Sequence, residues 1–473
     1  MNVTIAENRH SQPQKTEDFP QKSSVEHEEY VEECNLEQIT ENNITNINEK
    51  NVRLLEKILD RENMNKAYKR VKSNKGAQGV DGMRVGELLQ YLKLCGASVR
   101  QSIMDGKYKP NPVRRVEIPK EGGKTRPLGI PTVVDRLIQQ SITQILSPIY
   151  EKQFSDNSFG FRPNRSAHGA IRKCQNIIDL GYPYVIDMDL EKFFDTVNQS
   201  KLIEVLSRTI KDGRVISLIH KYLRAGVVVK HSFKETSEGV PQGGNLSPLL
   251  SNIMLNELDK ELTKRGHQFV RYADDLMIFF KSKRAAERTL ISITRFIEKK
   301  LFLKVNKEKT IVDEAWNVKF LGISFYQRDG KTRVKIHPKS IAKMKAKIKE
   351  LTSRNSGYSY QDMIENPKSY IRGWVNYFKI ADIKSLLIAV DKWMRRRIRA
   401  FFWKRWKKIK TKFEKLKYYG IKEHKAWEHA NTRKSYWRTA NSPILATTLK
   451  NSVLREMGYL FFYDYYMKVT DVN

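Results

Sequence analysis

The stretch Phe269-Val-Arg-Tyr-Ala-Asp-Asp-Leu-Met-Ile-Phe-Phe280 places two adjacent carboxylates, Asp274 and Asp275, inside an apolar run. Apolar segments on both sides of a short polar step predict two buried strands, with Tyr272-Ala-Asp-Asp275 as the tight turn between them. Two carboxylates at the tip of a buried hairpin are costly unless they are paired or bind metal. Alone, the stretch also fits a solvated Asp-Asp turn in an ordinary hairpin.

A second acidic segment precedes this hairpin. Residues 184–190 alternate like a strand, with Asp187 and Asp189 on one face, and a helix-like segment follows. Asp189 and Asp274 are 85 residues apart, so we expect them on neighbouring strands of one sheet. Together they would form a cradle for Mg²⁺, which accepts a few carboxylates and keeps positions for water and phosphate oxygens. Nucleotidyl transfer requires such a place, because it uses two divalent ions held about 3.5–4 Å apart.

Two further segments suit a nucleotide. In Gly239-Val-Pro-Gln-Gly-Gly-Asn-Leu-Ser-Pro248, the paired glycines let backbone approach a ligand, and Ser247 is expected to cap a following helix. In residues 118–131, basic side chains flank a Gly-Gly turn, and Arg126 offers a bidentate fork to phosphate. Each segment also fits a structure that binds no ligand. The first could be a simple strand-to-helix loop, and the second a solvated basic hairpin.

The charge of the chain predicts a polyanionic partner. Its 473 residues include 87 Lys and Arg against 53 Asp and Glu, a net charge of +34. Residues 1–50 contain 11 acidic and 4 basic residues, so they carry −7 and the remaining chain carries +41. A body this basic favours nucleic acid as its partner.

Membrane insertion and secretion are both disfavoured. The sequence contains no apolar span of about 20 residues, and its start lacks a signal-peptide pattern. The cysteines, Cys34, Cys95 and Cys174, are scattered and form no CxxC pair, which indicates a reducing compartment and argues against a zinc ribbon. We therefore expect a cytoplasmic protein.

The arrangement of motifs along the chain resembles the reverse transcriptases encoded by bacterial group II introns. Seven matching segments occur in collinear order: GKTRPLGIPT at 123–132, FGFRPNRSAH at 159–168, DLEKFFD at 189–195, GVPQGGNLSPLLSNI at 239–253, RYADDLMIFF at 271–280, NKEKT at 306–310 and KFLGISF at 319–325. GAQGVDG at 76–82 is similar to the family's N-terminal extension motif. One such motif is moderately specific, whereas seven in order are highly specific.

The resemblance implies an α+β fold, a right-hand polymerase whose fingers and antiparallel palm sheet precede an α-helical thumb. The expected divisions are an acidic, disordered segment at 1–50, fingers and palm at 51–325, a basic helical thumb and maturase domain at 338–450, and a short tail at 451–473 without an endonuclease domain. We expect the protein not to cleave target DNA to make its own primer, and to depend on another source such as a nascent strand.

The resemblance also assigns the reaction centre. Asp189 and Asp274 would ligate two Mg²⁺ ions, for which Mn²⁺ is a substitute. Asp275 would be the second carboxylate of the turn, and the Leu190 carbonyl would reach a metal. The reaction would extend a DNA primer on an RNA template with dNTPs.

Four residues would handle the incoming nucleotide. Lys120 and Arg126 would hold its triphosphate, and Gln242 would contact it. Phe194, five residues after Asp189, falls where the family has an aromatic ring beside the sugar 2′ position, and would exclude ribonucleotides by clash. Spacing alone selects Phe194 over Phe193, and one of the two rings is expected in the core.

The C-terminal part implies a second role, the binding of folded intron RNA to promote splicing. Asp391 to Lys417 contains 13 basic and 2 acidic residues. Among them lie aromatic rings, most of which we expect in the core, namely Trp393, Phe401, Phe402, Trp403 and Trp406. Charge density nominates a set of exposed residues for RNA contact: Arg395, Arg396, Arg397, Arg399, Lys404, Arg405, Lys407 and Lys408.

Three other functions compete with this one. The chain would be a splicing factor on an inactive polymerase fold, a reverse transcriptase of another lineage, or an RNA-templated RNA polymerase. The intact carboxylates disfavour the first, and Ser247-Pro248 with the long basic thumb disfavours the second. Phe194 disfavours the third. Monomer and homodimer both remain open.

Overall fold

The computed structural model describes residues 53–119, 125–230 and 232–470. The expected acidic segment at 1–50, and Lys120 among the nucleotide-binding residues, lie outside these ranges. No helix in the described ranges has both the length and the apolar character needed to cross a membrane.

A four-stranded sheet in the order β6-β7-β3-β8 carries the acidic motifs. Its strands are β3 (Tyr184–Met188), β6 (Gln268–Tyr272), β7 (Asp275–Phe280) and β8 (Ile311–Glu314). All neighbouring strands in this sheet are antiparallel. Tyr272 pairs with Asp275, so only Ala273 and Asp274 form the loop of the hairpin. The expected hairpin and the expected proximity of the two acidic segments are both confirmed.

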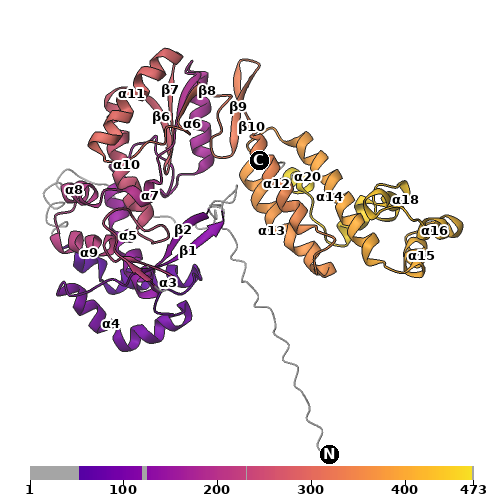
Figure 1. Ribbon diagram of the computed structural model, residues 1–473, viewed down its shortest axis with the longest axis horizontal. Helices are drawn as coiled ribbons and strands as arrows, with labels where there is room; N and C mark the ends of the chain where they lie inside the picture. Colours follow the sequence, from indigo (N-terminus) through magenta and orange to yellow (C-terminus); the bar gives the residue numbers. More distant parts are fainter. Residues whose placement is uncertain (1–52, 120–124, 231, 471–473) are drawn as a thin grey trace, which may run out of the picture. The chain divides into compact units, whose positions relative to one another are not determined.

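The strands of this sheet are buried on both faces. On one face, Ile186 and Ile278 join a core with helices α10 (Ser247–Lys264) and α11 (Lys283–Lys300). On the other face, Val185 and Met277 pack with helix α6 (Ala167–Asp179). Figure 1 shows α10 and α11 on one side of the sheet and α6 on the other. This two-sided burial explains why the motif reads as a continuous apolar run rather than as a strict alternation.

A second sheet, in the order β2-β1-β4-β5, lies in the fingers region. Its strands are β1 (Val113–Pro119), β2 (Thr125–Ile130), β4 (Val227–Val229) and β5 (Ser232–Lys234). The other helices before β5 are α2 (Leu54–Ile58), α3 (Arg61–Ser73), η1 (Val85–Glu87), α4 (Leu88–Met104), α5 (Val133–Glu151), α7 (Phe193–Thr196), α8 (Gln199–Thr209) and α9 (Gly213–Leu223). The antiparallel pairing of β1 with β2 confirms extended segments around the Gly-Gly turn.

A two-stranded hairpin, β9 (Ile323–Arg328) and β10 (Lys331–Ile336), leads into an all-helical part. Its helices are α12 (Pro338–Leu351), α13 (Tyr360–Phe378), α14 (Lys384–Arg405), α15 (Ile409–Tyr418), α16 (Glu423–Ala430), α17 (Tyr436–Thr439), α18 (Pro443–Thr448), α19 (Asn451–Glu456) and α20 (Phe462–Thr470). Helices therefore begin at 338 as expected. Of the five aromatic rings named in the basic stretch, four are buried, namely Phe401, Phe402, Trp403 and Trp406.

The start of α10 differs from expectation by one residue. The helix begins at Ser247 with Leu246 as its N-cap, and no side chain caps it. The Ser247 hydroxyl instead donates a hydrogen bond of 2.5 Å to the Pro241 carbonyl. This hydrogen bond closes the Gly-rich loop. The expectation of a helix cap was wrong because the Ser247 hydroxyl bonds to the loop instead.

Candidate active site

The acidic residues gather at one end of the two central strands. β3 ends at Met188, and β7 begins at Asp275 on the antiparallel neighbour, so Asp189 follows β3 where the turn of the hairpin lies. Asp187 lies one step inside β3, opposite Met277. Strand register therefore brings together the acidic segments that the sequence separates by 85 residues.

Burial and mutual repulsion raise the pKa values of two of these carboxyls, those of Asp187 and Asp275. Partial burial, followed by the charges of Asp275 and Asp189, raises the pKa of Asp187 to about 7. Asp275 keeps an exposed surface, yet protein atoms crowd its carboxyl. This desolvation, with the charges of Asp274 and Asp189, raises the pKa of Asp275 to about 6. A divalent cation would relieve this repulsion, and carboxylate oxygens are the donors that Mg²⁺ prefers.

The segment 306–310 fixes the backbone of Asp189. The Asn306 amide donates to the Asp189 carbonyl at 2.9 Å, and the Asp189 amide donates to the Thr310 hydroxyl at 3.2 Å. Leu190 forms an isolated bridge with Val305. The Asp189 carboxylate pairs with Lys309 at 3.1 Å. Within the described ranges, no three His, Cys, Asp or Glu side chains already stand together as a metal cage.

Arg126 of β2 and Gln242 of the Gly-rich loop contact each other, and Arg126 interacts electrostatically with Asp275. The Arg126 guanidinium donates to the Gln242 side-chain oxygen at 2.9 Å, which joins two of the expected nucleotide-binding residues. The Gly129 amide donates to the Gln242 carbonyl at 2.6 Å, so the Gly-rich loop lies against β2. The charges of Lys319 and Arg126 oppose the upward shift in the pKa of Asp275. The positive charge of Arg126 thus lies within electrostatic range of Asp275.

Both candidate rings for sugar selection are buried. Phe193 is 2% exposed and Phe194 is 7% exposed, and their rings meet edge to face with centroids 5.2 Å apart. The Phe194 carbonyl accepts a hydrogen bond of 2.6 Å from Val240, beside the Gly-rich loop. The structure places Phe194 next to the Gly-rich loop, and its role as a gate stays a prediction.

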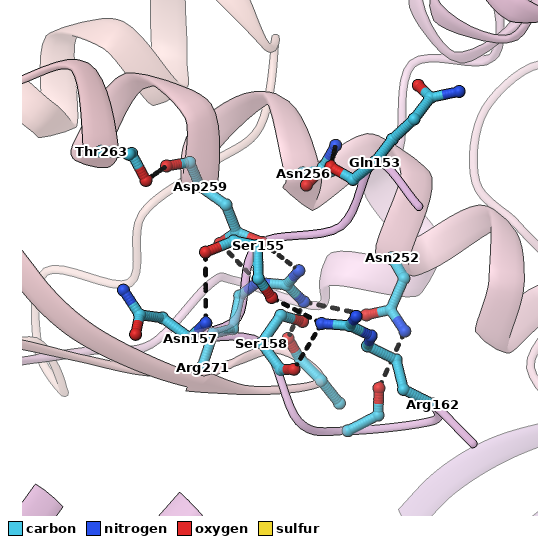
Figure 2. Close-up of polar contacts among 12 residues, drawn as sticks. Gln153, Ser155, Asn157, Ser158, Arg162, Asn252, Asn256, Asp259, Thr263 and Arg271 are labelled. Carbon is cyan, nitrogen blue, oxygen red and sulfur yellow. Dashed lines mark hydrogen bonds and ion pairs between the residues drawn. The ribbon is translucent and has the colours of Figure 1, made fainter. Parts of the chain in front are cut away.

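A buried polar network surrounds Arg271, the residue that immediately precedes the acidic turn (Figure 2). Arg271 is 1% exposed, and its guanidinium is ion-paired with Asp259, which is fully buried. It also donates to the Asn252 side-chain oxygen and to the Ala273 carbonyl, each at 2.9 Å. Ala273 has φ of +56°, a conformation that costs a non-glycine residue about 1–3 kcal/mol. A hydrogen bond from a charged donor contributes about 1.5–3 kcal/mol, enough to offset that cost.

Sequence reasoning missed this network. Its signal is present in α10, where Asn252, Asn256 and Asp259 lie on one face of a helix whose other buried residues are mostly apolar. Buried polar side chains at helical spacing require partners, but the sequence does not identify them. The partners of Asn252 are Arg271 in β6 and Gly160 in a loop. Gly160 is 92 residues away from Asn252 in the sequence.

The basic C-terminal stretch is less exposed than expected. Arg395, Arg396, Arg397 and Arg399 are only partly exposed, so the expectation of exposure is wrong for these four. Three of them satisfy backbone carbonyls near the ends of other helices: Arg396 donates to Trp437, Arg397 to Lys349 and Thr352, and Arg399 to Leu449. Charge density could not reveal this role, because it depends on which helices pack together.

The remaining basic candidates differ among themselves. Lys404 is partly exposed and donates to the Asn355 side chain at 2.6 Å. Arg405 is exposed and lies over the Tyr360 ring, 5.4 Å from its centroid. Lys407 and Lys408 are exposed. These last three residues retain the accessibility that contact with a polyanion requires.

Comparison with known proteins matches two family models to this chain. Residues 118–325 match the reverse transcriptase (RNA-dependent DNA polymerase) family, and residues 341–420 match the group II intron, maturase-specific domain. Protein YkfC of Escherichia coli K12 is 37% identical over 298 residues, which cover 54% of this chain and 78% of YkfC.

Two further relatives are proteins of introns. The group II intron-encoded protein LtrA of Lactococcus lactis is 40% identical over 240 residues, 50% of this chain and 39% of LtrA. The putative COX1/OXI3 intron 2 protein of Saccharomyces cerevisiae is 31% identical over 349 residues, 61% of this chain and 40% of that protein. The chain therefore matches about two fifths of the length of these two intron proteins.

Proposed function

Because the chain belongs to the group II intron family of reverse transcriptases with a maturase domain, we propose that it copies RNA into cDNA by two-metal nucleotidyl transfer. The observation that carries this proposal is one constellation: carboxylates with raised pKa values beside the Arg126–Gln242 pair. Clustered carboxylates suit divalent metal, and the adjacent guanidinium suits the triphosphate of an incoming dNTP.

The residues of the cluster fit divalent metal chemically, and the family depends on such metals in general. We propose Asp189, Asp274, Asp275 and the Leu190 carbonyl as oxygen ligands of two Mg²⁺ ions, with Mn²⁺ as a substitute. When bound, the metal would supply a lowered pKa for a primer 3′-hydroxyl and stabilisation of charge on the leaving pyrophosphate. Repulsion among the carboxylates, seen in the pKa of Asp187 and of Asp275, supports this ligand set.

The chain's own groups bind and orient the nucleotide. Arg126 and Lys120 would neutralise the triphosphate, and Gln242, held by Arg126, would position it. Phe194 would close the space beside the sugar 2′ position. Asn306 and Thr310 hold the backbone of Asp189 and so keep its carboxylate at the end of β3.

Primer extension tests the polymerase assignment. We expect the wild-type protein to extend a DNA primer on an RNA template with dNTPs and Mg²⁺. The double variant Asp274→Ala/Asp275→Ala should lose extension by a factor of about 10³ or more while it still binds primed template. Persistent cDNA synthesis by this variant would remove the acidic turn from the reaction centre.

We also propose that the helical part binds the intron RNA and assists splicing and mobility. The match to the maturase-specific domain supports this role, as does the net charge of +34. The exposed Arg405, Lys407 and Lys408 are the preferred contacts. Purification of the protein with its bound RNA, followed by sequencing, would identify that partner, and recovery of unrelated RNAs alone would contradict a cognate intron.

Two coarser assignments accompany this function. We propose fingers and palm over 51–325, a thumb and maturase domain over 338–450, and a short tail at 451–473. We also propose a reducing, cytoplasmic setting, which is supported by the free thiols of Cys95 and Cys174.

A further inference from the structure

We infer that Arg271 and Asn252 are positioning residues. They set the position and orientation of the acidic turn relative to α10 and the 155–162 loop. The inference rests on the proposed polymerase function and adds to it the device that holds Asp274 and Asp275 in place. Neither residue touches the reacting atoms, so both would act through the backbone of the turn.

The first link joins α10 to the turn. Arg271 Nε donates to Asp259 at 2.8 Å, and Nη1 donates both to Asn252 and to the Ala273 carbonyl at 2.9 Å. The guanidinium thus holds the one residue of the loop whose φ lies in the left-handed region. Since Asp259 and Asn252 belong to the same long helix, this link fixes the turn to α10 (Figure 2).

The second link joins the turn to residues 155–162. The backbone of Arg271 pairs with this loop, because its amide donates to Asn157 and its carbonyl accepts from Phe159, each at 2.8 Å. Arg162 folds the loop by donating to the Ser155 and Ser158 carbonyls and to Glu151. This arrangement gives a physical role to the FGFRPNRSAH motif, which the nucleotide-binding residues leave unexplained.

The third link is a direct backbone contact. A Cβ atom added to Gly160 would lie 2.2 Å from the Ala273 nitrogen and 2.9 Å from the Tyr272 carbonyl carbon. Only glycine therefore allows the backbone of the loop to approach the backbone of the turn this closely. Asn252 closes the arrangement, because its side-chain nitrogen donates to the Gly160 carbonyl at 2.8 Å while its oxygen accepts from Arg271.

These links converge on Asn252, which bridges the loop and the guanidinium. Asn256 provides a matched control one turn along the same helix. It is 4% exposed against 1% for Asn252, and it donates to the Gln153 carbonyl at 3.2 Å without touching Arg271 or the turn. Leucine at position 252 removes two hydrogen bonds, one of them with a guanidinium, whereas leucine at position 256 removes one. Asn252→Leu should therefore lose more stability, and the two variants are compared under conditions where both are folded.

The experiment compares Asn252→Leu with Asn256→Leu in the full chain, at a temperature where both are folded by circular dichroism. We expect Asn252→Leu to lower kcat for primer extension about tenfold or more, with KM for dNTP nearly unchanged, because displaced ligands slow the reaction rather than weaken nucleotide binding. Asn256→Leu should keep the kcat of the wild type. Equal kcat values in the two variants, or a loss confined to KM, would overturn the positioning role.

Mn²⁺ binding, followed by electron paramagnetic resonance, tests the same inference without polymerisation. Asn252→Leu should weaken Mn²⁺ affinity several-fold relative to Asn256→Leu, and unchanged affinity together with unchanged kcat would reject the inference. If wild-type protein binds Mn²⁺ but extends no primer, the proposed function fails while the binding comparison still decides the positioning role.

Gly160→Ala is a second test variant, which adds a methyl group instead of removing hydrogen bonds. Its added methyl group should lower kcat about 100-fold by displacing the turn. Gly213→Ala is the control, since a Cβ there meets nothing within 4 Å. If Gly160→Ala folds and keeps full kcat, the loop does not set the position of the turn.

Discussion

At the residue scale, the structure adds Asp187 to the carboxylates that we expect to influence metal binding. Its pKa of about 7, raised by burial and by Asp275 and Asp189, means that it carries a proton for part of the time at neutral pH. The pKa of Asp275 is about 6. Protons compete with a metal for carboxylates, so the Mg²⁺ concentration for half-maximal extension should rise as pH falls, first through about 7 and again through about 6.

Asp187→Asn should remove the upper of these two steps and leave the lower one. The measurement is the Mg²⁺ dependence of primer extension across that pH range. Asp195→Asn, at an exposed aspartate in α7, is the matched control and should retain both steps. If Asp187→Asn keeps the pH dependence of the wild type, Asp187 does not contribute to the metal site.

At the scale of elements, the docking of α20 onto α14 depends on one buried carboxyl. Asp391 is 2% exposed and accepts hydrogen bonds from the Phe462 and Tyr463 amides at 2.9 and 2.8 Å. Burial raises its pKa from the ordinary 3.8 to about 6. Between these values the folded protein holds a proton that the unfolded chain releases, so the contribution of Asp391 to stability falls as pH rises through this window.

Asp391→Asn should therefore show a pH-dependent difference from the wild type. The free energy of unfolding of the wild type minus that of the variant should decrease by about 3 kcal/mol from about pH 4 to about pH 6, and stay constant above. Urea titrations followed by tryptophan fluorescence would measure it. A difference that does not vary with pH would show that Asp391 does not hold a proton in the folded state.

At the scale of the whole molecule, the net charge of +34 predicts a steep loss of RNA affinity with salt. The structure divides the basic candidates by exposure. Lys407→Gln/Lys408→Gln should lower the log–log salt slope by about 1–2 with no loss of stability. Arg396→Gln should instead destabilise the fold, because Arg396 donates to the Trp437 carbonyl and lies 4.0 Å from the centroid of its ring.

Filter binding of RNA across a salt series, paired with urea unfolding of each variant, would separate these effects. A flat salt profile for the wild type would mean that the basic surface does not bind phosphate. An unchanged slope in the double lysine variant would place the RNA contacts elsewhere.

The sequence by itself determined the hairpin of residues 268–280, the strand at 184–188 and the helical character from 338 onward, because these depend on local apolar pattern. The order of its motifs identified the family, which the matches to 118–325 and 341–420 confirm. The roles of individual catalytic and nucleotide-binding residues stay predictions.

Only the tertiary structure decided which polar residues face the reaction centre and which hold the fold together. Arg126 meets Gln242 across 116 residues, Asn252 meets Gly160 across 92, and Arg397 meets Thr352 across 45. A guanidinium has the same charge whether it contacts a phosphate or a helix carbonyl. Its partner is set by strand register and helix packing, which no local pattern encodes.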